Sequence, residues 1–120
     1  MAHYDLPHQH GQDFNLVLEK VPDDEQFKIV SAAFQQLSDP TRLKIMWLLC
    51  HSEEGVYNIA AAMGMSNPAV SHLRLLRNSG LIVSRRDGKE VYYTIAKTNL
   101  SSLLHKTIDS LFEISCPTAK

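Results

Sequence analysis

Residues 66–80, SNPAVSHLRLLRNSG, combine hydroxyl, imidazole and guanidinium groups with three leucines on one short segment. Ser66 is a favourable N-cap and Gly80 a favourable residue just beyond a helix end, so the pattern predicts a short capped helix. Such side chains suit DNA, because Arg can bind guanine edges while Ser and His donate or accept hydrogen bonds. The candidate contacts within the helix are Ser71, His72, Arg74 and Arg77.

A second basic segment follows at once, over residues 81–95, LIVSRRDGKEVYYTI. Strand-like runs flank Asp87-Gly88, which predicts a β-hairpin with a two-residue turn. Near its tip lie Arg85, Arg86 and Lys89, which could contact phosphates. A capped polar helix followed by such a hairpin indicates a winged helix-turn-helix, in which one helix enters the major groove and the wing touches the backbone.

Charge is distributed unevenly, although the formal net charge is only −1. Residues 1–40 have two basic and seven acidic side chains, whereas residues 66–97 have six basic and two acidic ones. The basic third of the chain favours a nucleic-acid partner. The alternative is that these charges form an ordinary solvated surface.

The length of 120 residues suggests one domain, and the predicted fold is mainly α-helical with a β-hairpin wing, in the order α-α-α-α-β-β-α. We predict a mobile arm over 1–12, the winged domain over 13–115 and a tail over 116–120. Asp39 and Pro40 fit the N-cap and first positions of one helix. The other predicted helical stretches are 22–39, 55–64, 66–79 and 97–115, and 13–21 could form a further short helix. The pair within 55–79, joined by a short turn, is the helix-turn-helix.

The last predicted helix has an apolar face that is too long for a surface helix. It should pack on another helix, and we predict a homodimer through residues 100–112 together with the helix from about 24 to 37. The predicted interface residues are Leu100, Leu103, Leu104, Ile108, Leu111 and Phe112.

Several classes of protein are disfavoured by the sequence. No apolar run reaches the roughly 18 residues of a membrane span, and the polar N-terminus is unlike a signal peptide. Two cysteines make no disulfide framework, which favours a reducing, cytoplasmic location. An enzyme is not expected, because no nucleophile elbow, phosphate loop or paired carboxylates are present. The alternatives to a DNA-binding regulator are a winged-helix interaction module that has lost DNA binding or metal sensing, or a thiol-based redox sensor.

Residues 30–115 resemble the ArsR/SmtB family of bacterial repressors, through LSDPTRLKIMWLL, MSNPAVSHLRLLRNSGLIVSRRDGKEVYYTI and the final amphipathic helix. The resemblance implies a homodimeric transcriptional repressor that binds palindromic operator DNA and is released by an inducer, usually a metal ion. It places Ser66, Asn67, Pro68, Ser71, His72 and Arg74 on the DNA-reading helix, and Arg85, Arg86 and Lys89 on the wing.

The family's usual sensing sites are poorly matched in this chain. The cysteine positions of one site fall on Gly55 and Tyr57, and the positions of the other fall on Lys97, Asn99, Ser110 and Glu113. Only Glu113 could bind a metal there.

Other side chains could bind zinc or a similar transition metal, because imidazole and thiolate are good ligands. His8 and His10 in LPHQHG could reach His51 or His105, and we predict that any metal site uses this arm. The alternative is a histidine-containing tail without a metal. Cys50 is predicted to be a small core residue, and Cys116 an exposed, oxidisable thiol.

The leucines of the first segment do not follow one helical stripe. At about 100° per residue from Val70, Leu73 falls at about 300°, Leu76 at about 240° and Leu75 at about 140°. The family pattern has one more residue after Ser71, commonly a second His. We infer a one-residue deletion, absorbed either by an overwound or bulged helix near 71–73 or by rotation of the segment before Ser71. Either change would alter DNA binding. The alternative to a deletion is an error in the sequence.

Overall fold

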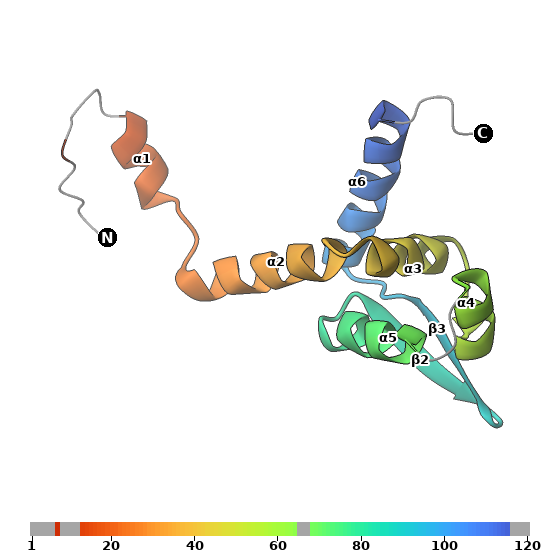
Figure 1. The fold of residues 1–120 in the computed structure, drawn as a ribbon. Coiled ribbons are helices and arrows are strands. Elements are labelled where there is room, and N and C mark those ends of the chain that lie inside the picture. Colours follow the sequence, from red (N-terminus) through yellow and green to blue (C-terminus); the bar gives the residue numbers. More distant parts are fainter. Residues whose placement is uncertain (1–6, 8–12, 65–67, 116–120) are drawn as a thin grey trace. The chain divides into compact units, whose positions relative to one another are not determined.

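The computed structural model describes residues 7, 13–64 and 68–115. The chain divides into two compact units, residues 1–31 and 32–120. The first unit holds α1 (Asp13–Glu19) and the start of α2 (Asp24–Leu37) (Figure 1). A reciprocal capping box begins α2: the N–H of Gln26 donates to the Asp23 carboxylate at 2.8 Å, and the N–H of Asp23 donates to the Gln26 amide oxygen at 3.0 Å. These bonds satisfy donors that a helix start leaves unpaired.

The second unit combines helices with a small antiparallel sheet. Its sheet has the order β1-β3-β2. Its elements in chain order are α3 (Pro40–His51), β1 (Glu54–Gly55), α4 (Val56–Ala62), α5 (Pro68–Asn78), β2 (Ile82–Asp87), β3 (Glu90–Ile95) and α6 (Asn99–Ser115). The predicted winged helix-turn-helix is confirmed, with α4 and α5 as the helix pair. The further short helix considered over 13–21 is present as α1. The structure also adds the two-residue strand β1, which is too short to have a sequence signature.

The start of α3 is formed as predicted from Asp39-Pro40. The Asp39 carboxylate accepts the backbone N–H of Arg42 at 2.9 Å, and Pro40 occupies the first turn. This backbone hydrogen bond also holds the pKa of Asp39 below its ordinary value.

The end of α5 depends on Gly80, again as predicted. Gly80 has a φ of 77°, a conformation that side chains other than glycine rarely adopt. The N–H of Leu81 donates to the carbonyl of Leu76 at 3.1 Å, and that of Gly80 donates to Arg77 at 3.0 Å. This pair of bonds is a Schellman motif, and it turns the chain directly from the helix into β2.

The hairpin turn lies one residue later than predicted. Asp87 pairs with Glu90, so the two loop residues are Gly88 and Lys89 rather than Asp87 and Gly88. Gly88 has a φ of 64°, whereas Lys89 has no positive φ. A positive φ at the first loop position alone is the pattern of a type II′ turn, which needs glycine only there.

A single apolar core holds the second unit together. Side chains from α3, α4, α5, the start of β2 and α6 meet in it. Its most deeply buried apolar members are Ile45, Met46, Leu49, Leu73, Leu76, Leu81 and Ile82. No helix in the described ranges is both long and apolar enough to cross a membrane.

Candidate nucleic-acid interface and histidine cluster

The predicted DNA-reading helix, α5, is α-helical throughout Pro68–Asn78. Leu73 and Leu76 are both buried, so the prediction of an overwound or bulged helix is wrong. The other predicted outcome, a rotated start of the helix, agrees with Val70, which is 44% exposed. The physical reason is that Leu73 and Leu76 anchor the helix, which places Val70 about 90° from the centre of the buried face.

The outer face of α5 lies opposite Leu73 and Leu76. By the helical step of about 100°, Ser71, Arg74 and Asn78 fall within about 60° of one another on this face. All three are exposed, and so is Arg77 at its edge. Pro68 begins the helix, whereas Ser66 and Asn67 lie outside the described residues. The outer face therefore offers a hydroxyl, an amide and two guanidinium groups.

His72 differs from the other predicted DNA contacts. It is half-buried, and its Nδ1 lies 3.2 Å from the guanidinium of Arg42 on α3. Arg42 in turn donates through Nε to the carbonyl of Gln36 at 2.9 Å. Because a guanidinium only donates, Nδ1 of His72 accepts, and the imidazole positions α5 on α3. Contact of His72 with DNA stays a prediction, whereas its contact with α3 is present in the folded chain.

The basic residues of the hairpin wing differ in whether they form an ion pair. Arg85 forms a bidentate pair with Glu53, with N···O distances of 2.8 and 2.7 Å, and its guanidinium lies 4.9 Å from the centre of the Tyr92 ring. This pairing lowers the pKa of Glu53 and raises that of Arg85. Arg86 and Lys89 are exposed and have no ionic partner within the described part of the chain.

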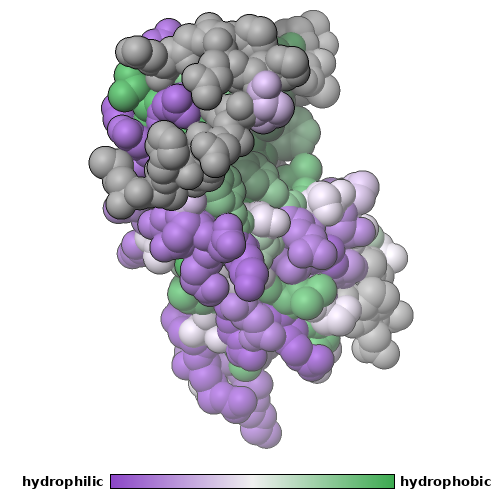
Figure 2. Space-filling view, turned by 90° about the vertical axis from the view of Figure 1, so that its left-hand side faces the viewer, coloured by the Kyte–Doolittle hydropathy of each residue, from purple (hydrophilic) through white to green (hydrophobic). Residues whose placement is uncertain are grey.

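The end of the wing is hydrophilic, as the lower, projecting part of Figure 2 shows. α5 packs beside β2, so the helix and the wing are neighbours in the winged unit (Figure 1). Because no described carboxylate pairs with them, Arg86 and Lys89 are the wing residues best placed to meet phosphates.

The apolar face of α6 divides between the protomer's own core and solvent. Leu104 and Ile108 are only 7% and 5% exposed and belong to the core, which sequence periodicity could not distinguish from an interface. Leu100 is half-buried. Leu103, Leu111 and Phe112 are exposed. The predicted interface residues that α6 leaves available to a second copy are therefore Leu103, Leu111 and Phe112.

Two of the predicted metal-binding residues come together in the folded chain. His51 ends α3 and His105 lies on α6, with their ring centres 4.9 Å apart. Asp109, which the sequence analysis missed, joins them: its carboxylate oxygens lie 3.4 Å from Nε2 of His51 and 3.0 Å from Nε2 of His105. The spacing of His105 and Asp109, four residues apart in a predicted helix, was the available signal. His8 and His10 lie outside the described residues.

Cys50 lies next to this cluster and packs against the core, as predicted. Burial, and after it the negative charge of Asp109, raises the pKa of the Cys50 thiol to about 11. The reactive form of cysteine is the thiolate, so a raised pKa disfavours redox sensing at this residue. Cys116 lies outside the described residues.

Cys50 should therefore react slowly with alkylating reagents. At pH 8 a thiol of pKa about 11 is roughly 0.1% thiolate, against about a quarter for an ordinary cysteine. Even allowing for the greater nucleophilicity of a basic thiolate, we expect iodoacetamide to react at least about tenfold more slowly. The rate should be measured in a Cys116→Ser variant, with the same variant in urea as the control. Equal rates in the two conditions would contradict this account of Cys50.

Comparisons with known proteins match both the sequence and the fold. Residues 39–84 match the model of the family described as "Bacterial regulatory protein, arsR family". A transcriptional repressor SmtB homolog of Synechocystis is 37% identical over 110 residues, covering 91% of this chain and 83% of that protein. A cadmium resistance transcriptional regulatory protein CadC homolog of Staphylococcus aureus is 38% identical over 79 residues, covering 64% of this chain and 65% of that protein.

A solved structure shares the architecture. The solution structure of a homodimeric winged helix-turn-helix DNA-binding domain from Mycobacterium bovis, a possible ArsR-family regulator, has a TM-score of 0.69 at 28% identity. The match covers 80% of this chain and 92% of that one. The 91% of this chain that the SmtB homolog covers includes the helix pair and the wing.

Proposed function

This chain belongs to the arsR family of bacterial regulatory proteins and is a transcriptional regulator rather than an enzyme, and from that premise we propose that it represses transcription in the cytoplasm by binding palindromic operator DNA as a homodimer. The observation that carries the proposal is the regular helix α5, which turns a polar, basic face outward beside a wing with two exposed cations, Arg86 and Lys89. Ser71, Arg74 and Arg77 would enter the major groove. Arg86 and Lys89 would contact the backbone on either side.

Salt-dependent binding to duplex DNA tests this proposal and separates it from a winged-helix module that binds only protein. A protein that neutralises phosphates loses affinity steeply as salt rises, because bound counterions are released. We expect the affinity for DNA from the protein's own promoter region to fall with salt, measured by fluorescence anisotropy. A protein that binds no duplex at low salt would be the interaction module instead.

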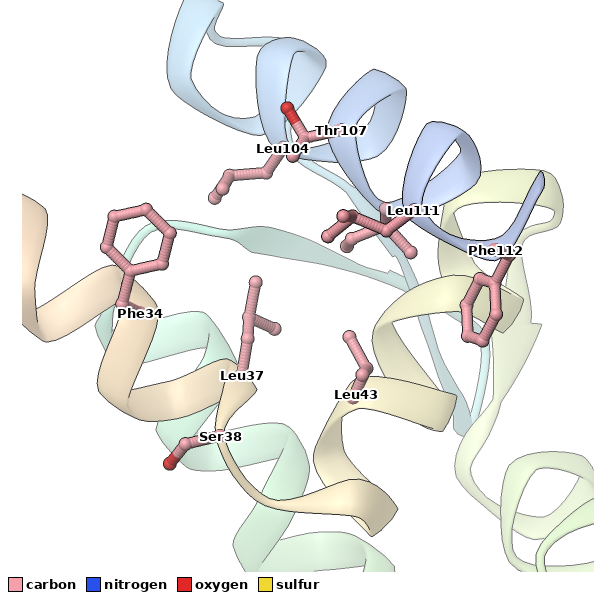
Figure 3. Close-up of a pocket in the computed structure, with 9 residues that line it drawn as sticks. Phe34, Leu37, Ser38, Leu43, Leu104, Thr107, Leu111 and Phe112 are labelled. Carbon is pink, nitrogen blue, oxygen red and sulfur yellow. The ribbon is translucent and has the colours of Figure 1, made fainter. Parts of the chain in front are cut away.

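A second copy of the chain is the proposed occupant of an apolar groove between α2, α3 and α6. The groove has a volume of about 430 Å³. Figure 3 shows Phe34 and Leu37 of α2 on one side, Leu43 of α3 below, and Leu111 and Phe112 of α6 on the other. Phe34 is 61% exposed, a large apolar side chain of the kind that a partner usually covers. The M. bovis neighbour is described as homodimeric, and a dimer doubles the DNA surface that one short module can bury.

The pairing of Arg85 predicts unequal effects of the three wing cations. Arg86→Ala and Lys89→Ala should each lower DNA affinity for all sequences and reduce the slope of log affinity against log salt by about one per protomer. Arg85→Ala should have a smaller effect, because Glu53 already neutralises this guanidinium. Glu53→Ala should free Arg85 and strengthen binding. If Arg85→Ala cost as much as Arg86→Ala, the ion pair would not persist on DNA.

Release from DNA is proposed to follow binding of a transition-metal ion. One relative is named for cadmium resistance, which supports a metal as the class of inducer for this chain. Of the usual ligand positions, only that of Glu113 holds a good metal ligand. The others hold Gly55, Tyr57, Lys97, Asn99 and Ser110, which offer poor ligands or none. The cluster of His51, His105 and Asp109 has the nitrogen and oxygen donors that such ions accept.

A further inference from the structure

We propose that His51, His105 and Asp109 form a site for one divalent transition-metal ion in each protomer, at the junction of α3 and α6. The proposal deepens the metal response proposed above, because it identifies the ligands. It differs from the sequence-based prediction that the N-terminal arm supplies the essential ligands. It also uses none of the positions of the family's usual sites.

The ligand atoms already converge. One nitrogen from each imidazole and one carboxylate oxygen all lie within 4.8 Å of one another. Asp109 lies close to both imidazoles, with one carboxylate oxygen 3.4 Å from Nε2 of His51 and the other 3.0 Å from Nε2 of His105. Ligands bound tetrahedrally at about 2.0–2.1 Å from zinc are roughly 3.3 Å apart. Small side-chain rotations therefore suffice to place an ion between the three groups.

The backbone positions all three ligands without the ion. His105 and Asp109 are four residues apart, so they project from the same face of α6. His51 belongs to the last turn of α3, and its ring lies 4.5 Å from that of Trp47 one turn earlier. The imidazole of His51 is thus held by a neighbouring ring and faces α6. A site whose ligands are held in place loses less conformational entropy when the ion binds.

The cluster is also open to an ion from solution. The side chains of His51, Asp109 and His105 are 41%, 37% and 30% exposed. Three protein ligands leave one tetrahedral position for water or another group, as in catalytic zinc sites. Two imidazoles and one carboxylate suit zinc, cobalt or nickel better than calcium or magnesium, which prefer oxygen ligands alone.

The position of the site connects it with the DNA-binding wing. His51 stands two residues before Glu53, the carboxylate that binds Arg85 on β2. The chain between them passes directly from the end of α3 toward β1, which pairs with β3 of the wing. An ion that fixes the end of α3 on α6 would therefore act on the segment that holds the wing. This is the physical route by which the site would change DNA affinity.

The test is titration of metal-free, full-length protein with zinc by calorimetry and with cobalt by visible absorption, both without DNA. We expect one ion per protomer and the intense absorption bands of tetrahedral cobalt. His51→Ala and His105→Ala should each lower affinity by at least about 100-fold, and Asp109→Asn by at least about tenfold. His72→Ala is the matched control, because it removes a half-buried imidazole elsewhere, and it should bind metal as the native chain does. Circular dichroism should confirm that each variant is folded.

Deletion of residues 1–11 decides between this site and the arm. We expect the shortened chain to keep one ion per protomer. If deletion abolishes binding while His51→Ala and His105→Ala retain it, the ligands lie in the arm and the proposal is overturned. The effect of the ion on DNA affinity is measured separately. If an ion binds at these residues without changing operator affinity, the metal site is confirmed but its proposed role in release from DNA is wrong.

Discussion

Replacing Leu111 and Phe112 together by glutamate should convert the dimer into folded monomers that have lost at least about 100-fold in affinity for operator DNA. Both side chains line the apolar groove and are 56% and 44% exposed in the single chain. A charge at these exposed positions leaves the protomer folded, but in the dimer interface it would be buried without water or an ionic partner. The loss of DNA affinity follows because two linked modules bind DNA far more tightly than one.

Analytical ultracentrifugation at micromolar concentration measures the first effect. Ser110→Glu is the control for adding negative charge to α6, because it places one glutamate at an exposed position that does not line the groove. Leu104→Glu with Ile108→Glu should behave differently, because these residues are in the protomer's own core. Two charges there cost more than about 4 kcal/mol of unfolding free energy, so the chain should unfold. A native chain that sediments as a monomer would contradict the proposed dimer.

Inserting histidine after Ser71 should stabilise the protein and change its operator affinity by at least about tenfold. The insertion rotates the start of α5 by about 100° relative to Leu73 and Leu76. Val70 then moves from its half-exposed place to the buried side, which should add about 1 kcal/mol to the free energy of unfolding. Residues before the insertion also turn relative to Arg74, so the set of side chains facing the groove changes.

Insertion of alanine at the same place is the control that separates register from side chain. It restores the rotation without adding an imidazole, so it should reproduce the gain in stability. Any additional change in DNA affinity in the histidine variant then belongs to the imidazole. Urea denaturation and anisotropy measure the two effects, and the intact mass of the native chain confirms its length. Unchanged stability and DNA affinity in both insertion variants would show that the position of Val70 around the helix axis affects neither property.

Local features of this protein could be predicted from the sequence because they depend on neighbouring residues. Asp39 caps α3 through an N–H three residues away, and Gly80 ends α5 because its own backbone adopts a positive φ. The strand-like runs on both sides of Asp87-Gly88 likewise predict a hairpin, although the two loop residues lie one position later than expected. With the leucine and arginine spacing of α5, these features were enough to identify the winged helix-turn-helix and its outer face.

Only the tertiary structure decided which distant groups meet. His51 and Asp109 are 58 residues apart, and Arg85 and Glu53 are 32 apart, so neither pair has a local signature. Periodicity placed Leu104 and Leu111 on one apolar face, but packing against α3 buries the first and leaves the second exposed. The strained helix expected from the leucine spacing of α5 did not form, because exposing Val70 costs less than distorting the backbone. Caps and turns are set by a few adjacent dihedral angles, whereas burial and ion pairs depend on how whole elements pack, and a single sequence records that packing only indirectly.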